Sequence, residues 1–397
     1  MVVYLDNNAT TQVDPIVLEA MLPYLTEFYG NPSSMHSFGG QVGAAVQDAR
    51  EQVASLLGAE DTEIIFNSCG SEGNNTAIHA ALAAQPEKRH IITTAVEHPA
   101  ILNVCKHLEK KGYTVTYLSV DGRGQIDLME LEAAITGGTA LVTTMYANNE
   151  TGVIFPIEQV GAIAKEYDAI FHVDAVQAVG KVAIDLSSST IDLLTLSGHK
   201  LHAPKGIGAL YVRRGFRFRP FLLGGHQERG RRAGTQNVAG IVALGKAAEL
   251  AKQDLCNAPK ESWLRDCLER ELLDIIPDCQ VNGGGAPRLP NTTNIGFKYI
   301  EGEVILYMLN REGICASSGS ACTSGSLDPS HVLTAMGLPY TILHGSIRFS
   351  LSRFTTEGEI QHVLAVMPGI VEWLRELSPF NNDQAEWLQE RDVAVAT

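Results

Sequence analysis

The sequence predicts an α/β protein in which a large domain with a mostly parallel sheet is joined to a smaller α+β domain. From about residue 14, short apolar runs alternate with segments of helical periodicity, a pattern typical of a parallel sheet covered on both faces. The composition shifts near residue 256, where a long helical segment precedes a mixture of strands and helices. A chain of 397 residues also favours two domains. We expect a large domain over 14–255 and a small domain formed by 1–13 and 256–397.

The predicted strands of the large domain are short apolar runs bounded by polar or turn residues. They cover 63–66, 90–93, 114–118, 140–145, 169–173 and 193–196, with a further strand at 208–212 that can be antiparallel. Helical periodicity between most of them predicts helices at 45–57, 75–84, 100–110, 128–135 and 157–166. In the small domain, helices are expected at 261–275 and 301–310, and extended segments at 291–297 and 346–351.

Composition excludes several classes of protein. The formal net charge of −15 argues against general binding to nucleic acids. The seven cysteines are scattered without a CxxC pair, so free thiols in a reducing cytoplasm are expected rather than disulfides or a zinc site. The N-terminus lacks the features of a signal peptide, and no apolar run approaches 18 residues. We therefore expect a cytoplasmic protein without a membrane segment.

Asp174 and Lys200 are the most informative pair in the chain. Asp174 ends a predicted strand, where ligands of α/β sheets bind, and Gln177 follows it. Lys200 closes the run Ser197-Gly-His-Lys200 after the next strand. Pyridoxal phosphate (PLP) requires a lysine for a Schiff base, an acid that keeps its ring nitrogen protonated, and donors for its oxygens. Singly, Asp174 is as readily a helix cap and Lys200 a solvated lysine, so only the combination predicts PLP.

Three further segments follow predicted strands and supply polar groups to the same edge of the sheet. The segment 67–75 precedes a helix, and its Gly70 and Ser71 suit a phosphate at the helix N-terminus, although an ordinary capped helix start explains them equally well. His98 can stack on a cofactor ring, or simply cap a helix. Asn149 can contact the ring oxygen. Together these segments offer polar groups for the phosphate, the ring face and the ring oxygen of the cofactor.

Cys322 lies in a run of small residues, 317–326. Such a run supplies little surface for a core, so a mobile loop carrying a thiol is expected. Without the cofactor motif, Cys322 would most simply be a bystander thiol. Beside that motif, it suggests an enzyme that moves sulfur off an amino acid.

These motifs together resemble the cysteine desulfurases of the NifS/IscS type, within the aminotransferase-like (fold type I) PLP enzymes. The similarity extends over nearly the whole chain and includes the segments 4–11, 30–34, 97–101, 148–152, 172–177, 197–200, 228–235, 317–326 and 347–356. The long small-residue segment around Cys322 resembles the first group of these enzymes, and 231–239 resembles its NifS branch. Ser71, Cys69 and Gln236 replace residues more frequent in the family, without removing a catalytic role.

The resemblance implies a role for each site residue. Lys200 binds PLP covalently and removes the substrate Cα proton, Asp174 pairs with the pyridine nitrogen, and Cys322 accepts the sulfur. The other cofactor contacts are implied for the ring oxygen (Gln177 and Asn149), the ring face (His98) and the phosphate (Gly70, Ser71, Ser197 and His199).

Arg348, assisted by Asn149, is implied as the group that binds the substrate carboxylate, for which a guanidinium has the matching geometry. Thr235 is implied to reach the phosphate of the other subunit, so a homodimer with shared active sites is expected. No resident metal is implied, apart from transient ligation of an iron–sulfur cluster by Cys322.

The resemblance thus predicts an enzyme that converts L-cysteine to L-alanine and carries persulfide sulfur on Cys322. The sulfur would pass to an iron–sulfur scaffold or another acceptor protein, with nitrogenase as one destination. A selenocysteine or cysteine lyase that releases selenide or sulfide is the nearest alternative, and the long Cys322 loop argues against it. An aminotransferase would leave that loop unexplained. A non-catalytic sulfur-relay or scaffold protein would have no need of Lys200 and Asp174.

Overall fold

The computed structural model describes residues 2–255, 258–318 and 329–378. Cys322 lies outside these residues. Within them, the chain folds around a seven-stranded sheet whose strand order is β2-β8-β7-β6-β5-β3-β4. These strands are β2 (Ile64–Asn67), β8 (Gly208–Val212), β7 (Leu193–Ser197), β6 (Ile170–Asp174), β5 (Thr139–Met145), β3 (His90–Thr94) and β4 (Thr114–Leu118).

The pairing of these strands confirms the predicted α/β class. Strands β7, β6, β5, β3 and β4 are parallel to one another. Strand β8 is antiparallel to both β2 and β7, in agreement with the antiparallel direction considered for it from the sequence. The parallel strands end at one edge, so the residues that follow them gather there.

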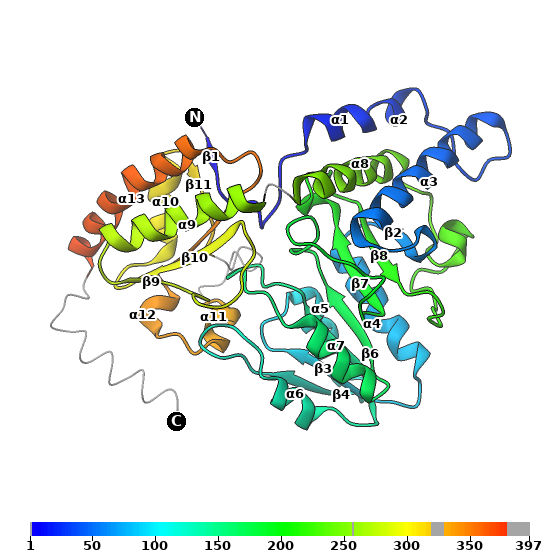
Figure 1. The fold of residues 1–397 in the computed structure, drawn as a ribbon, viewed down its shortest axis with the longest axis horizontal. Coiled ribbons are helices and arrows are strands. Elements are labelled where there is room, and N and C mark those ends of the chain that lie inside the picture. Colours follow the sequence, from blue (N-terminus) through cyan, green and yellow to red (C-terminus); the bar gives the residue numbers. More distant parts are fainter. Residues whose placement is uncertain (1, 256–257, 319–328, 379–397) are drawn as a thin grey trace.

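Helices cover both faces of the sheet (Figure 1). They are α1 (Pro15–Met21), α2 (Pro23–Thr26), α3 (Ser37–Leu57), α4 (Gly70–Ala84), α5 (Pro99–Glu109), α6 (Leu128–Ala134), α7 (Ile157–Glu166) and α8 (Val238–Asp254). Successive residues of a strand are buried in two different hydrophobic cores, one on each face of the sheet. Leu193 belongs to the core with α4 and α5, whereas Leu194 belongs to the core with α3, α7 and α8. This two-sided burial explains why the strands are apolar runs rather than alternating patterns.

Two helices, α3 and α4, begin at least five residues earlier than predicted. Helix α3 starts at Ser37 instead of 45, with His36 Nδ1 accepting a hydrogen bond from Gly39 N. Its first turns are rich in glycine, a poor helix former, which concealed them. Gly39 is required there, because a Cβ would lie 2.6 Å from the carbonyl oxygen of Asn31. Helix α4 starts at Gly70 rather than 75, which places Gly70 and Ser71 in its first turn.

The C-terminal part forms a second, smaller layer of sheet and helices (Figure 1). Strands β12 (Ser346–Ser350), β10 (Thr292–Phe297) and β9 (Cys279–Val281) pair antiparallel in this order, and β1 (Val3–Tyr4) pairs in parallel with β11 (Ile314–Cys315). The accompanying helices are α9 (Ala258–Ile275), α10 (Gly302–Arg311), α11 (His331–Ala335), α12 (Tyr340–Leu343) and α13 (Glu357–Leu377).

Val3 and Leu5 of the N-terminus are buried in the same core as these C-terminal elements. The segment 6–12 then passes from this core to the large sheet, and Thr11 N donates to the carbonyl oxygen of His199. The domain boundaries at 14 and 256 stay a prediction. Among the described helices, none is long and apolar enough to cross a membrane.

Candidate active site

The structure brings ten of the predicted site residues into one cavity of about 380 Å³. The cavity lies where the parallel strands end and where the C-terminal layer meets the large sheet. It is lined by Gly70, Ser71, His98, Asn149, Asp174, Gln177, Ser197, His199, Lys200 and Arg348. Residues separated by nearly 280 positions therefore meet at one site.

Asp174 ends β6, and both of its carboxylate oxygens are held in place. Oδ2 accepts a hydrogen bond of 2.6 Å from Asn74 Nδ2, and Oδ1 accepts one from Val176 N. The hydrogen bond from Val176 N is the local capping contact that the sequence also predicted for Asp174. The hydrogen bond from Asn74 is not local, because Asn74 lies on helix α4. Because Asp174 is buried and lines the cavity without an ion pair among the described residues, a protonated ring nitrogen fits beside it.

The start of α4 has the properties of an anion site. No described side chain caps this 15-residue helix. Ser197 Oγ, from the end of β7, is buried and has no hydrogen-bond partner within the described residues. A Cβ on Gly70 would lie 2.9 Å from Val176 Cγ2, so glycine permits the close packing of backbone here. A phosphate would satisfy both the free N–H groups of the helix and the orphaned hydroxyl.

Lys200 follows β7 in a short 3₁₀ turn, Gly198–Lys200. Its Nζ donates to the carbonyl oxygens of Asn8 and Ala9, the latter at 2.6 Å. The chain segment before α1 thus holds the amine at the cavity wall. Asn8 and Ala9 also line the cavity, although we assigned them no role from the sequence.

Two histidines near the cofactor position are neutral at physiological pH. Burial lowers the pKa of His98, and Nδ1 of this residue accepts a hydrogen bond from Ala100 N as the cap of α5. The remaining proton of the neutral ring is therefore on Nε2. Burial, together with the charge of Lys200, lowers the pKa of His199 to about 4. His98 is thus both a helix cap and a cavity residue.

Gln177 is oriented by a residue that sequence reasoning missed. Lys181 Nζ donates to Gln177 Oε1 at 3.0 Å, and Gln177 Nε2 donates to the carbonyl oxygen of Asn8. Burial lowers the pKa of Lys181 to about 8, and the carboxylate of Glu261 opposes this effect. The ammonium fixes the amide so that its N–H side, not its carbonyl side, remains available for an oxygen acceptor.

Arg348 closes the cavity from β12 and is almost completely buried. Nη2 forms an ion pair of 2.7 Å with Asp6 Oδ1, and Nη1 donates to the carbonyl oxygen of Asn149. Nε is buried and finds no acceptor in the part of the chain that is described. The guanidinium therefore retains an unused donor for a carboxylate.

Thr235 lies in a separate depression beside Glu228 and Arg232, not in the main cavity. Its implied role concerns the phosphate of the other subunit.

The sequence did not predict two further residues near the site, Asn74 and Asp6. Asn74 could have been found from the sequence, because its amide lies one helical turn after Gly70. Asp6 lies in the segment 4–11, which contributes to the family resemblance, but the sequence alone assigned it no role.

The fold and this cavity define a PLP-binding enzyme of the aminotransferase type, since the buried acid, the lysine and the anion site all fit that cofactor. Residues 3–363 match the family model of the class-V aminotransferases. The chain is 76% identical over 395 residues to cysteine desulfurase 2 of Trichormus variabilis, covering 100% of this chain and 99% of the relative. It is 58% identical to the cysteine desulfurase NifS of Azotobacter vinelandii, covering 95% and 94% of the two chains.

Solved structures agree with this relationship. A NifS-like protein superposes with a TM-score of 0.88 at 40% identity, covering 94% of this chain and 100% of that one. The apo cysteine desulfurase of Thermococcus onnurineus gives a TM-score of 0.84 at 26% identity over 94% and 95% of the two chains. The chain belongs to the class-V aminotransferase family, and within it to the PLP-dependent cysteine desulfurases.

Proposed function

We propose that the chain converts L-cysteine to L-alanine in this cavity and transfers the sulfur to Cys322. The observation that carries the proposal is the presence of Arg348, Lys200 and Asp174 in the wall of one cavity. An amino acid bound through its carboxylate to Arg348 would have its reacting carbon near the cofactor and Lys200. The high identity to cysteine desulfurases favours cysteine as that amino acid.

Each residue has a proposed task at a stated atom. PLP, when bound, supplies the electron sink that makes the substrate Cα–H acidic. Asp174 keeps the ring nitrogen protonated, and Lys200 Nζ accepts the Cα proton after it is released from its contacts with Asn8 and Ala9. Gln177 Nε2 and Asn149 would hold the phenolic oxygen of the cofactor, and His98, with its proton on Nε2, would lie against the cofactor ring.

The start of α4 would hold the phosphate through Gly70 and Ser71, and Ser197 and His199 would add side-chain donors. Sulfur transfer then consists of one bond exchange. The Cys322 thiolate attacks the substrate sulfur, so that an S–S bond forms while the Cβ–S bond breaks. The electron pair of the broken bond stays with carbon, which takes up a proton and becomes the methyl group of alanine.

We propose that the active enzyme is a homodimer in which Thr235 reaches the phosphate of the other subunit. Support comes from the segment 227–236, which is hydrogen-bonded to α3 and β2 and does not line the cavity of its own chain. Arg50 holds Glu228 through two hydrogen bonds of 2.7 and 2.9 Å, and Glu228 also accepts from Phe66 N. This arrangement presents Thr235 at a depression away from the cavity.

The proposed destination of the sulfur is a protein acceptor in iron–sulfur cluster assembly, with nitrogenase maturation as one such pathway. Similarity to the NifS protein supports this destination. Cys322 would also contact a nascent cluster transiently, and the described residues contain no His, Cys, Asp and Glu group suited to a resident metal. We place the reaction in the cytoplasm, where the five free cysteines of the described chain would stay reduced.

The test is a single-turnover reaction of the PLP-loaded protein and of Cys322→Ala with L-cysteine. We expect alanine and a mass gain of one sulfur atom in the unchanged protein. Both should be lost in the variant, while its cofactor absorbance is retained. Alanine with free sulfide from the variant would instead indicate a lyase, and protein that never acquires cofactor absorbance would favour a non-catalytic relay.

A further inference from the structure

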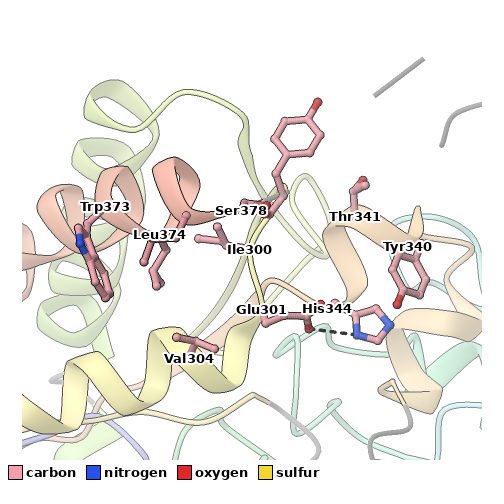
Figure 2. Close-up of a pocket in the computed structure, with 11 residues that line it drawn as sticks. Ile300, Glu301, Val304, Tyr340, Thr341, His344, Trp373, Leu374 and Ser378 are labelled. Atoms are coloured by element: carbon pink, nitrogen blue, oxygen red, sulfur yellow. Dashed lines mark hydrogen bonds and ion pairs between the residues drawn. The ribbon is translucent and has the colours of Figure 1, made fainter. Parts of the chain in front are cut away.

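The C-terminal layer carries a second cavity, of about 260 Å³, which the catalytic site does not use. It is an apolar groove between α10, α12 and α13 (Figure 2), and its main walls are Val304, Tyr340, Trp373, Leu374 and Leu377. A dry cavity of about 150 Å³ accommodates a benzene ring. This groove is therefore large enough for an aromatic side chain.

Three of the apolar side chains that line the groove are largely exposed to solvent in the isolated chain. Leu377 is 64% exposed, Tyr340 is 51% exposed and Trp373 is 46% exposed. Because these side chains line one concave pocket, the groove is suited to bind an apolar side chain. The groove also contains a polar group without a partner: His344 pairs through Nδ1 with Glu301 at 3.4 Å (Figure 2), whereas its Nε2 is buried and unbonded among the described residues.

The chain itself leaves the described structure at the rim of this groove. Helix α13 ends at Leu377, and Ser378 both lines the groove and turns into an extended conformation. Its hydroxyl donates to the carbonyl oxygen of Tyr299 at 2.6 Å, which fixes the direction of exit. Phe380 follows two residues later, within about 7 Å of chain length from this anchor.

The residues beyond Ser378 have the composition that such a groove requires. Segment 379–397 is mostly polar and acidic, with Phe380, Trp387 and Leu388 as its large apolar side chains. Their spacing of seven and eight residues is the one that brings side chains to a common helix face.

We infer that the groove between α10, α12 and α13 binds the C-terminal segment 379–397 of the same chain, with Phe380 and Trp387 as its apolar anchors. The covalent attachment of this segment at the groove favours it as the occupant over a second copy of the protein. A segment attached at the groove rim has an effective concentration in the millimolar range, whereas a second copy competes at its bulk concentration. The inference is independent of the catalytic cavity and of the proposed function.

The experiment places a photoreactive benzoylphenylalanine at position 380, and in a second protein at position 387, of the full-length PLP-loaded chain. After irradiation, the cross-linked peptides are identified by mass spectrometry. We expect cross-links to α10 or α12 in a band of single-chain mass. Cross-links to α13 alone are disregarded for position 380, because that helix is adjacent in the sequence.

A matched pair of variants tests the groove itself. Val304→Asp, in the groove wall, should reduce the yield of both cross-links at least fivefold. Met129→Asp, at an exposed apolar position on α6 outside the groove, should leave them unchanged. A thermal melt of each variant checks that the fold persists, and the same probe at Leu377 verifies the photochemistry.

Three outcomes would overturn the inference. Cross-links to α10 or α12 in a band of twice the chain mass would assign the groove to a second copy. Cross-links from positions 380 and 387 to elements outside the groove would place the segment elsewhere. Absence of cross-links from both positions, while the probe at Leu377 reacts, would show that the segment does not occupy the groove.

Discussion

Arg348 and Asp6 form a buried ion pair of 2.7 Å at the wall of the catalytic cavity, and Arg348 Nε remains without an acceptor in the described chain. The side chains come from β12 and from the N-terminal segment, 342 positions apart. Asp6 thus holds the guanidinium in place before the substrate arrives. A carboxylate bound to Arg348 would use the donor that Asp6 leaves free.

Arg348→Lys should therefore weaken substrate binding more than chemistry. Lysine cannot reproduce the planar fork, and the loss of a charge-assisted contact costs about 1.5–3 kcal/mol, which is roughly tenfold or more in KM. Steady-state kinetics with L-cysteine measure the effect. Arg375→Lys, remote from the cavity, serves as the control and should leave KM unchanged. An unchanged KM in Arg348→Lys would remove this residue from the substrate site.

Ser197→Ala should weaken PLP binding without weakening the apo-protein. The hydroxyl is buried and unpaired among the described residues, so its removal relieves an unsatisfied group in the absence of phosphate. In the complex, it would donate to a charged phosphate, a bond worth about 1.5–3 kcal/mol. We expect at least a tenfold higher Kd for PLP and an equal or higher Tm of the apo-protein. A lower apo Tm with unchanged PLP affinity would contradict the assignment.

Lys181→Met tests whether Lys181 acts through Gln177. Without the ammonium at Gln177 Oε1, the amide is free to turn, and a donor to the ring oxygen of PLP is lost. Because that donor and the nearby positive charge both favour the ionised oxygen, the pH at which the cofactor absorbance changes should rise. Spectrophotometric titration measures this shift.

Two matched variants make the Lys181 test specific. Lys246→Met removes a half-buried lysine on α8, paired with Glu249 and not part of the cavity wall, and should not move the titration. Lys181→Met in a Gln177→Leu background should move it much less than in the unchanged protein, because the amide is already absent. A full additional shift in that background would show that Lys181 acts by its charge alone.

Glu97 should make the stability of the protein depend on pH. Burial raises the pKa of this carboxyl to about 8, although Thr94 Oγ1 and Met145 N both donate to Oε1. Because the unfolded pKa is near 4.5, the folded protein retains a proton that the unfolded chain loses between these values. The stabilising contribution is complete below pH 4.5 and is lost as the pH rises to about 8.

Denaturant unfolding of the protein and of Glu97→Gln at several pH values measures this contribution. The difference in unfolding free energy between them should change by up to about 1.4 kcal/mol per pH unit within the window. Taking the difference cancels opposite effects from His172 and Lys181, whose pKa values burial lowers. A pH-independent difference would show that Glu97 is ionised in the folded protein.

The sequence predicts the parts of this molecule that depend on local pattern. Strand ends, together with the polar residues after them, placed Asp174, His98 and Lys200 at one edge of the sheet, because parallel strands end together. The same reasoning could not find Asp6, Asn8 or Asn74, whose partners are far away in the chain. The start of α3 was missed because local glycines oppose a helix that tertiary packing stabilises.

The most direct test of the central claim is the location of the bound cofactor. The PLP-loaded protein is reduced with borohydride, digested, and searched for the phosphopyridoxyl group by peptide mass spectrometry. The account predicts one group per chain, on the peptide that carries Lys200, and its loss in Lys200→Ala. A label on Lys181, Lys205 or another lysine in the unchanged protein would contradict the assignment of this cavity as the catalytic site.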